Sequence, residues 1–153
     1  MKRFIVVGAV ALMCAGGAAG AQDPVSPEVG AEIVAARQAA FMMSGVTVGS
    51  IKASLDSDAP AQSMGFSSNA LKRWSSSMTN LFPAGTGPDA VPATRAKAEI
   101  WTDWTGFKSK ADDYAAAAAR LQELIAAGDN AAALEQFNVV RASCQACHDA
   151  YRS

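Results

Sequence analysis

Apolar residues recur every three or four positions in four separate stretches of this sequence, and that spacing constrains its fold more than any other feature. The spacing places apolar side chains along one face of an α-helix, and clusters of proline and glycine separate the stretches. We predict helices over 27–55 and 62–82, a third that Asp103 caps and Gly128 ends, and a fourth that follows the cap Asp129.

Each predicted helix carries one stripe of residues expected to face a common core. In chain order the stripes are Val34, Arg37, Phe41, Ser44, Val48, Ile51 and Leu55; Leu71, Trp74, Met78 and Leu81; Trp104, Phe107, Ala111, Tyr114, Ala118, Leu121 and Ile125; and Leu134, Phe137, Arg141, Cys144, His148 and Tyr151. Four helices with one stripe each bury them together as an antiparallel four-helix bundle, so the predicted fold class is all-α. The connection over 83–102 is longer than a usual loop, which indicates that it is functional or covers part of the bundle.

Residues 1–21 have the features of a secretory signal, namely a basic start, an apolar run and a small-residue end. The pattern Ala19-Gly20-Ala21 fits a cleavage site, so we expect a cut before Gln22 and a folded domain over 22–153. The apolar run is shorter than the roughly 20 residues that cross a bilayer, which disfavours a membrane anchor.

Cleavage at Cys14, as in a lipoprotein, is an alternative, but either cut exports the chain, and the expected location is the periplasm. The 132 residues after the expected cut carry 11 basic and 14 acidic groups, a net charge of −3. This balance excludes an electrostatic nucleic-acid binder. The length suffices to bury one core without disulfides, and no membrane association is expected once the signal is removed.

The residues Cys144-Gln145-Ala146-Cys147-His148 form the pattern C-x-x-C-H, the attachment signature of c-type haem. On a helix, residues three and four apart share a face, so both sulfurs and the imidazole are predicted to point into the bundle. The two thiols would bond covalently to one haem c, and His148 would bind its iron as the metal ligand.

Three other interpretations of the motif fit less well. A structural zinc site needs four ligands, and the chain offers two cysteines and one histidine there. A thioredoxin-type pair belongs at the start of a helix near a βαβ unit, whereas these cysteines lie at the end of the last predicted helix. A disulfide between Cys144 and Cys147 would close almost no loop and stabilise little.

These residues, with several others, resemble the cytochrome c′ family, the four-helix class of c-type cytochromes. The resemblance extends over essentially all of 22–153, and its features are Arg37-Gln38-Ala39-Ala40-Phe41, Phe82-Pro83-Ala84-Gly85-Thr86, Glu99-Ile100-Trp101 and the ending Cys144 to Arg152. A haem motif at the far C-terminus is typical of this class. The chain departs from the family at Ala93, where members often have an acidic residue before the Thr-Arg pair.

Arg37 lies on the predicted buried stripe, and burial of its charge demands an anionic partner, for which a haem propionate is the candidate. A surface arginine with its charge in water is the alternative. The resemblance implies propionate contacts for Arg37 and Gln38, a haem contact for Thr94 in the connection, and the distal position opposite His148 for Phe41.

Arg152 follows His148 by four positions, and the resemblance places it near the proximal face of the haem, where it affects ligand handling. A cation that complements the dipole of the last helix is an equally good explanation of this arginine. The resemblance also implies a homodimer formed through the first two helices.

The function expected from these features is that of a five-coordinate haem protein that binds small gases such as nitric oxide and carbon monoxide and exchanges single electrons with an unidentified redox partner. A six-coordinate electron carrier with Met42 or Met43 as the sixth ligand is the main alternative. We do not expect an enzyme such as a peroxidase, because the sequence has no second histidine to act as acid or base.

Overall fold

The computed structural model describes residues 23–153 and is helical throughout most of this range. Its elements are α1 (Pro27–Asp56), η1 (Ala61–Met64), α2 (Gly65–Ser77), η2 (Met78–Leu81), α3 (Glu99–Thr102), α4 (Trp104–Ala127) and α5 (Asn130–Tyr151). The expected signal and its cleavage site end at the border of the described residues and lie outside them. Within 23–153, no helix is both long and apolar enough to span a bilayer.

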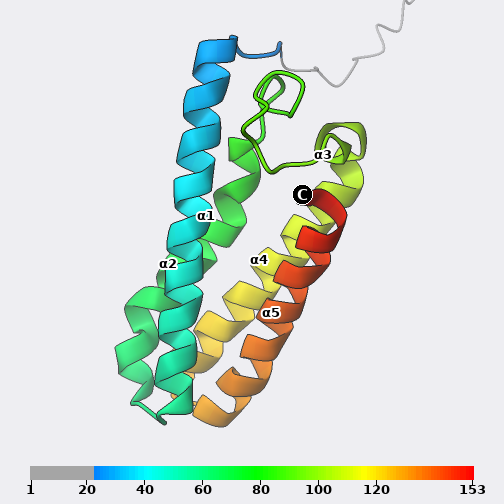
Figure 1. Ribbon diagram of the computed structural model, residues 1–153. Coiled ribbons are helices and arrows are strands. Elements are labelled where there is room, and N and C mark those ends of the chain that lie inside the picture. The colour runs from blue at the N-terminus through cyan, green and yellow to red at the C-terminus, as the bar shows by residue number, and fades with distance from the viewer. Residues whose placement is uncertain (1–22) are drawn as a thin grey trace, which may run out of the picture.

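The helices α1, α2, α4 and α5 form the predicted antiparallel four-helix bundle (Figure 1). Short links join α1 to α2 and α4 to α5, so the members of each pair run in opposite directions. A long connection crosses one end of the bundle between η2 and α4. The all-α fold class is therefore confirmed.

The predicted helix boundaries depend on capping residues, and three of them are confirmed. Asp103 accepts a hydrogen bond from the Gly106 amide at 3.1 Å at the start of α4, and Asp129 accepts one from the Ala132 amide at 3.0 Å at the start of α5. Gly128 ends α4 with a φ of 78°, a left-handed conformation that glycine adopts without strain.

The prediction of one continuous helix over 62–82 is wrong, because this segment consists of α2 with a 3-10 turn at each end. Serines at the end of α2 provide a physical reason. The hydroxyls of Ser75 and Ser76 donate to the carbonyls of Lys72 and Arg73, and side-chain bonds of this kind compete with regular helix.

The predicted core stripe of α5 needs correction. Leu134 is 40% exposed and Arg141 lies on the surface. The residues that α5 turns inward are instead Ala133, Phe137, Val140, Cys144, Cys147 and Tyr151, spaced alternately four and three apart. Ala133 is fully buried, so the small side chain allows α5 to approach the bundle where a leucine would hold it away. Trp104, expected on the α4 stripe, is 41% exposed at the first position of its helix.

The connection after η2 is bound to both sides of the bundle. At its start, the Ala84 carbonyl accepts from the Val25 amide at 3.0 Å, just before α1. At its end, the Lys97 amide donates to the Tyr151 carbonyl at 3.0 Å, and the Ser153 amide donates to the Arg95 carbonyl at 3.0 Å. The connection therefore ties α1 to the C-terminus of α5, and the expectation that it covers part of the bundle is confirmed.

Candidate haem site

A cavity of about 1060 Å³ lies beneath this connection, between α1 and α5. It is at the upper end of the roughly 300–1,000 Å³ typical of cofactor pockets. Its inner wall is largely aromatic and apolar, and includes Phe41, Val48, Trp74, Met78, Phe82, Ile100 and Phe107. The cavity can therefore accept a large, flat, apolar group.

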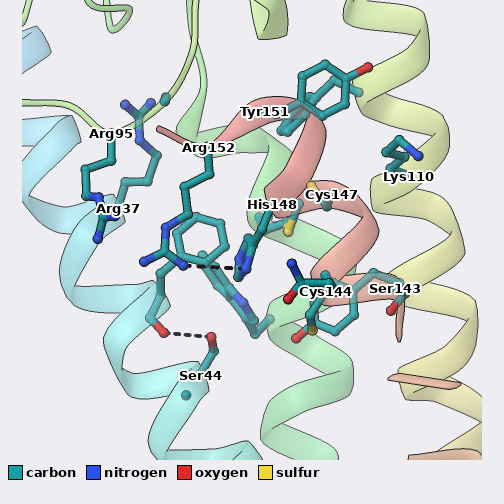
Figure 2. Close-up of a pocket in the computed structure, with 18 of the residues that line it drawn as sticks. Arg37, Ser44, Arg95, Lys110, Ser143, Cys144, Cys147, His148, Tyr151 and Arg152 are labelled. Atoms are coloured by element: carbon teal, nitrogen blue, oxygen red, sulfur yellow. Dashed lines mark hydrogen bonds between the residues drawn. The ribbon is translucent and has the colours of Figure 1, made fainter. Parts of the chain in front are cut away.

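The three residues of the C-x-x-C-H motif all line this cavity, as their helical spacing predicts. Cys144, Cys147 and His148 are each partly buried on the last two turns of α5, and no disulfide joins the two cysteines (Figure 2). Burial raises the pKa of both thiols above the usual value. The pKa of a thioredoxin-type cysteine is lowered, so this interpretation of the pair is disfavoured.

A zinc site is also disfavoured. Among residues 23–153, no three histidine, cysteine, aspartate or glutamate side chains gather closely enough to hold a metal ion. The histidine that lines this cavity is His148, and the two cysteine thiols lie beside it on α5.

His148 faces Arg152 one turn further along α5, with 3.5 Å between Arg152 Nη1 and His148 Nδ1 (Figure 2). Burial, and then the charge of Arg152, lower the pKa of His148, which favours the neutral imidazole that binds metals. Arginine only donates hydrogen bonds, so this contact requires Nδ1 to accept and Nε2 to carry the proton. A metal bound at Nε2 would move that proton to Nδ1 and remove the acceptor for Arg152.

Arg37 is buried, as predicted, with only 3% of its surface exposed. Its Nη1 donates to the Leu81 carbonyl at 3.0 Å and to Thr86 Oγ1 at 3.1 Å, and its Nη2 donates to the Thr86 carbonyl at 3.0 Å and to Thr94 Oγ1 at 2.7 Å. The guanidinium carbon also lies 4.4 Å from the centre of the Phe82 ring. Arg37 therefore fixes the connection to α1.

The hydrogen bonds of Arg37 do not need an anionic partner, but its positive charge has none among the described residues. Neutral oxygens satisfy both terminal nitrogens, and no carboxylate among residues 23–153 forms an ion pair with Arg37. Burial lowers its pKa to about 10, so the group stays charged at neutral pH. The hydrogen bonds are satisfied within the protein while the charge remains uncompensated beside the cavity.

The other residues implied by the resemblance also reach the cavity. Gln38 is exposed at its edge and donates from Nε2 to the Ala93 carbonyl at 3.1 Å. Thr94 accepts from Arg37 and from the Ala96 amide, so it positions the connection. Phe41 packs edge to face against Trp74, with 5.0 Å between ring centres.

Sequence reasoning missed three features in and around the cavity. Met78, predicted only as a core residue, is 3% exposed and lines the cavity, so it is a possible iron ligand that was not considered. Of the two methionines that were considered, Met42 lines the cavity and Met43 does not. Thr86 is fully buried and shares two bonds with Arg37, although the sequence showed it only as part of a matching motif. The buried indole nitrogen of Trp74 has no hydrogen-bond partner among the described residues.

The cavity fits a haem in size, in its apolar wall and in the paired thiols beside an imidazole. An uncompensated buried cation at its side suits the propionates of that group. An all-α bundle with such a site defines a c-type haem protein of the four-helix class.

Comparison with known proteins agrees. The family model for cytochrome c′ matches residues 32–152. The chain is 31% identical to cytochrome c′ of Allochromatium vinosum, over all of this chain and 99% of the relative. It is 30% identical to cytochrome c′ of Rubrivivax gelatinosus, over 76% of this chain and 90% of the relative.

Solved structures extend this likeness. A cytochrome c′ with ligand-controlled dimer dissociation matches with a TM-score of 0.74 and 31% identity, over 84% of this chain and 98% of the other. A nitric oxide complex of a cytochrome c prime variant from Alcaligenes xylosoxidans matches with a TM-score of 0.73 and 30% identity, over 86% and 99%. The chain belongs to the cytochrome c′ family, and its cofactor is covalently attached haem c.

Proposed function

We propose that this protein is a periplasmic gas-binding haem protein in which His148 is the only protein ligand of the iron. The haem supplies an iron that binds diatomic gases and exchanges one electron. Cys144 and Cys147 would attach the haem through thioether bonds. The positive charge of Arg37 would balance the negative charge of one propionate, and Gln38 and Thr94 line the cavity beside Arg37. The neutral state of His148, favoured by burial, is the state that a metal ligand needs.

The observation that carries this proposal is the wall around Phe41. This side chain lies in an aromatic cluster with Trp74 and Phe82, at 5.0 and 6.2 Å between ring centres. An apolar wall on the distal side offers charged ligands nothing to replace their hydration, so it favours small neutral molecules such as nitric oxide and carbon monoxide. A related protein has been solved with nitric oxide bound, which supports the same ligand class here.

The rate of carbon monoxide binding to the ferrous protein tests the role of Phe41. Phe41→Ala should speed binding about tenfold or more, because the ring that crowds the distal site is removed. Phe137→Leu, in the core away from the cavity wall, is the matched control and should leave the rate within about twofold. Equal rates in Phe41→Ala and the unaltered protein would show that Phe41 does not crowd the ligand.

The assignment of the two thioethers has a separate test. Acidified organic solvent should leave the haem on the protein, because covalent bonds hold it. The variant with Cys144→Ala and Cys147→Ala should release any haem that it binds. Release from the unaltered protein would contradict the assignment.

A six-coordinate electron carrier remains the second candidate. The side chains of Met42 and Met43 are 72% and 63% exposed, which disfavours both as ligands. Met78 is the methionine that favours this candidate, because its buried thioether side chain lines the cavity. The coordination state of the iron separates the two candidates.

We also propose a homodimer formed through α1 and α2. Met43 and Val46 on α1 and Phe66 on α2 are 63%, 62% and 87% exposed, so both helices present large apolar side chains that a dimer interface would bury. A related structure shows a ligand-controlled dimer dissociation. Light scattering should give twice the chain mass, and Val46→Glu should reduce it to one chain; a monomer before substitution would contradict the proposal.

A further inference from the structure

We propose that the mouth of the cavity, between α1 and α5, docks the acidic face of a one-electron redox protein. The proposal rests on the haem site and on the electron-transfer part of the proposed function. It concerns three exposed arginines at the mouth, Arg95, Arg141 and Arg152.

Charges of the two signs are distributed unevenly over this molecule. The residues after the expected signal include 11 basic and 14 acidic groups. Five of the basic groups line the cavity, namely Arg37, Arg95, Lys110, Arg141 and Arg152, and none of the described acidic residues does so. A chain with a net negative charge therefore presents a positive opening.

The arginines of α5 reach the mouth because of their helical spacing. Asn138, Arg141, Gln145, His148 and Arg152 all line the cavity and follow one another three or four positions apart. They form a second stripe, beside the one that faces the core. Arg95 joins Arg152 at the mouth because Ala96 pairs with Arg152 in an antiparallel bridge (Figure 2).

Two of these charges are fully available to a partner. Neither Arg141 nor Arg152 forms an ion pair with a carboxylate among residues 23–153. Arg95 is exposed, but its Nε donates at 3.1 Å to the main-chain carboxyl oxygen of Ser153.

The charge of Asp149 acts on His148, and this carboxylate accepts a hydrogen bond from Gln145. The Lys97 ammonium donates to the main-chain carbonyls of Asp149 and Ala150, which places a positive charge close to that residue.

A haem in the cavity leaves the mouth positive. Its two propionates bring two negative charges, and Arg37 already supplies one buried positive charge against them. The three exposed arginines and Lys97 still outnumber the remaining propionate, Asp149 and the carboxyl group of Ser153 that Arg95 binds. An acidic protein surface is the complementary partner, because opposite potentials steer two proteins together and fix their orientation.

A second copy of this chain is a poorer occupant. The apolar surface suited to self-association lies on α1 and α2, at Met43, Val46 and Phe66. The mouth itself is polar and charged of one sign, so two mouths would repel each other. The reaction at the mouth is transfer of one electron from the reduced centre of the partner to ferric haem, or the reverse, with no bond made or broken.

The test uses two anionic probes, ferricyanide and polyglutamate. Ferricyanide takes one electron from the reduced protein, and its rate should fall about tenfold between about 10 and 200 mM ionic strength, although the protein has a net negative charge. Polyglutamate of about 20 residues should bind the ferric protein in calorimetry at low salt and slow the ferricyanide reaction.

Arg141→Glu should slow the ferricyanide reaction about threefold or more at low salt and abolish polyglutamate binding. Arg73→Glu makes the same change of charge on the exposed side of α2 and should alter neither. Carbon monoxide binding should be unchanged in both variants. A failure of the docking proposal can therefore be told apart from a failure of the gas-binding proposal.

Two results would overturn the docking proposal. A ferricyanide rate that rises with ionic strength would mean that the net charge governs approach, not the mouth. Attraction of ferricyanide without binding of polyglutamate would mean that the mouth accepts small anions only.

Discussion

At the end of the bundle where α1 leads into η1, the inward side chains are aliphatic and almost fully enclosed, whereas at the end where the chain terminates they surround a cavity. Ile51, Met64, Leu71 and Leu121 of the closed end are 0–1% exposed. Phe41, Trp74, Cys144 and His148 of the cavity end are only partly buried. Protein side chains complete the first end, and the second is complete only with its haem.

The two ends are also held differently. Burial of apolar surface stabilises the closed end, where the contacts are between apolar side chains of regular helices. At the cavity end, polar contacts hold the long connection, chiefly the three bonds of Arg37 to Thr86 and Thr94 and the pairing of residues 95–97 with the C-terminus. Stability can thus be concentrated at one end while the other keeps space for a ligand.

The largest expected effect follows from weakening the closed end. Leu121→Ala removes a fully buried side chain from α4 and should lower the free energy of unfolding by about 2–5 kcal/mol. Val48→Ala at the cavity wall removes a partly buried side chain and should cost less than about 1.5 kcal/mol. Urea unfolding of both variants measures the comparison, and an equal or larger loss in Val48→Ala would contradict it.

Removing the four hydrogen bonds of Arg37 should have the next largest effect on the free energy of unfolding. Arg37→Leu leaves the buried carbonyl of Thr86 without its donor, and each such buried acceptor costs about 1–3 kcal/mol. Arg37→Lys keeps the charge but cannot reproduce the fork of four bonds, so it should recover only part of the loss. Urea unfolding and the reduction potential are the measurements. If Arg37→Leu changes neither the free energy of unfolding nor the potential, the hydrogen bonds of Arg37 do not stabilise the protein.

The sequence was sufficient to predict the side chains of the closed end and the meeting of Cys144, Cys147 and His148 at one cavity, because both follow from helical spacing. Asp103, Gly128 and Asp129 also marked their helix ends correctly, since their capping chemistry is local. The stripe of α5 was misassigned by one position at Leu134, because alanine gives a weak signal in a periodicity argument. Close approach of the helices, which selects Ala133, is a property of the assembled bundle.

The cavity end was less predictable, because its contacts join distant parts of the chain. Burial of Arg37 followed from its stripe, but the oxygens of Thr86 and Thr94 that it binds come from a connection with no periodicity. The same holds for the position of Arg95 beside Arg152, which depends on the pairing of the connection with the C-terminus.

The smallest expected effect concerns the bond that joins the last turn of α5 to the cap of α4. Tyr151 donates its hydroxyl to Asp103 Oδ2 at 2.7 Å. This bond, and then the Gly106 amide, hold the pKa of Asp103 below its usual value, and the same bond raises the pKa of Tyr151 to about 12. Both groups therefore link stability to pH.

The signs of the two effects are opposite. Asp103 stabilises the fold above the unfolded pKa of about 4, and this is lost as pH falls through its lower folded pKa. Tyr151 stabilises it below about pH 10, and this is lost as pH rises through about 12. Tyr151→Phe should flatten the pH dependence of the urea midpoint in both windows; an unchanged dependence would mean that the bond is broken in solution.

Resonance Raman spectra of the ferric and ferrous protein test most directly the claim that the cavity end keeps a free iron position for gases. The account predicts five-coordinate, high-spin iron in both states, unchanged in Met42→Leu and Met78→Leu, and a new six-coordinate species when carbon monoxide is added to the ferrous form. A low-spin, six-coordinate spectrum before any gas is added, converted to high-spin by Met78→Leu or Met42→Leu, would contradict it and identify an electron carrier with a methionine ligand.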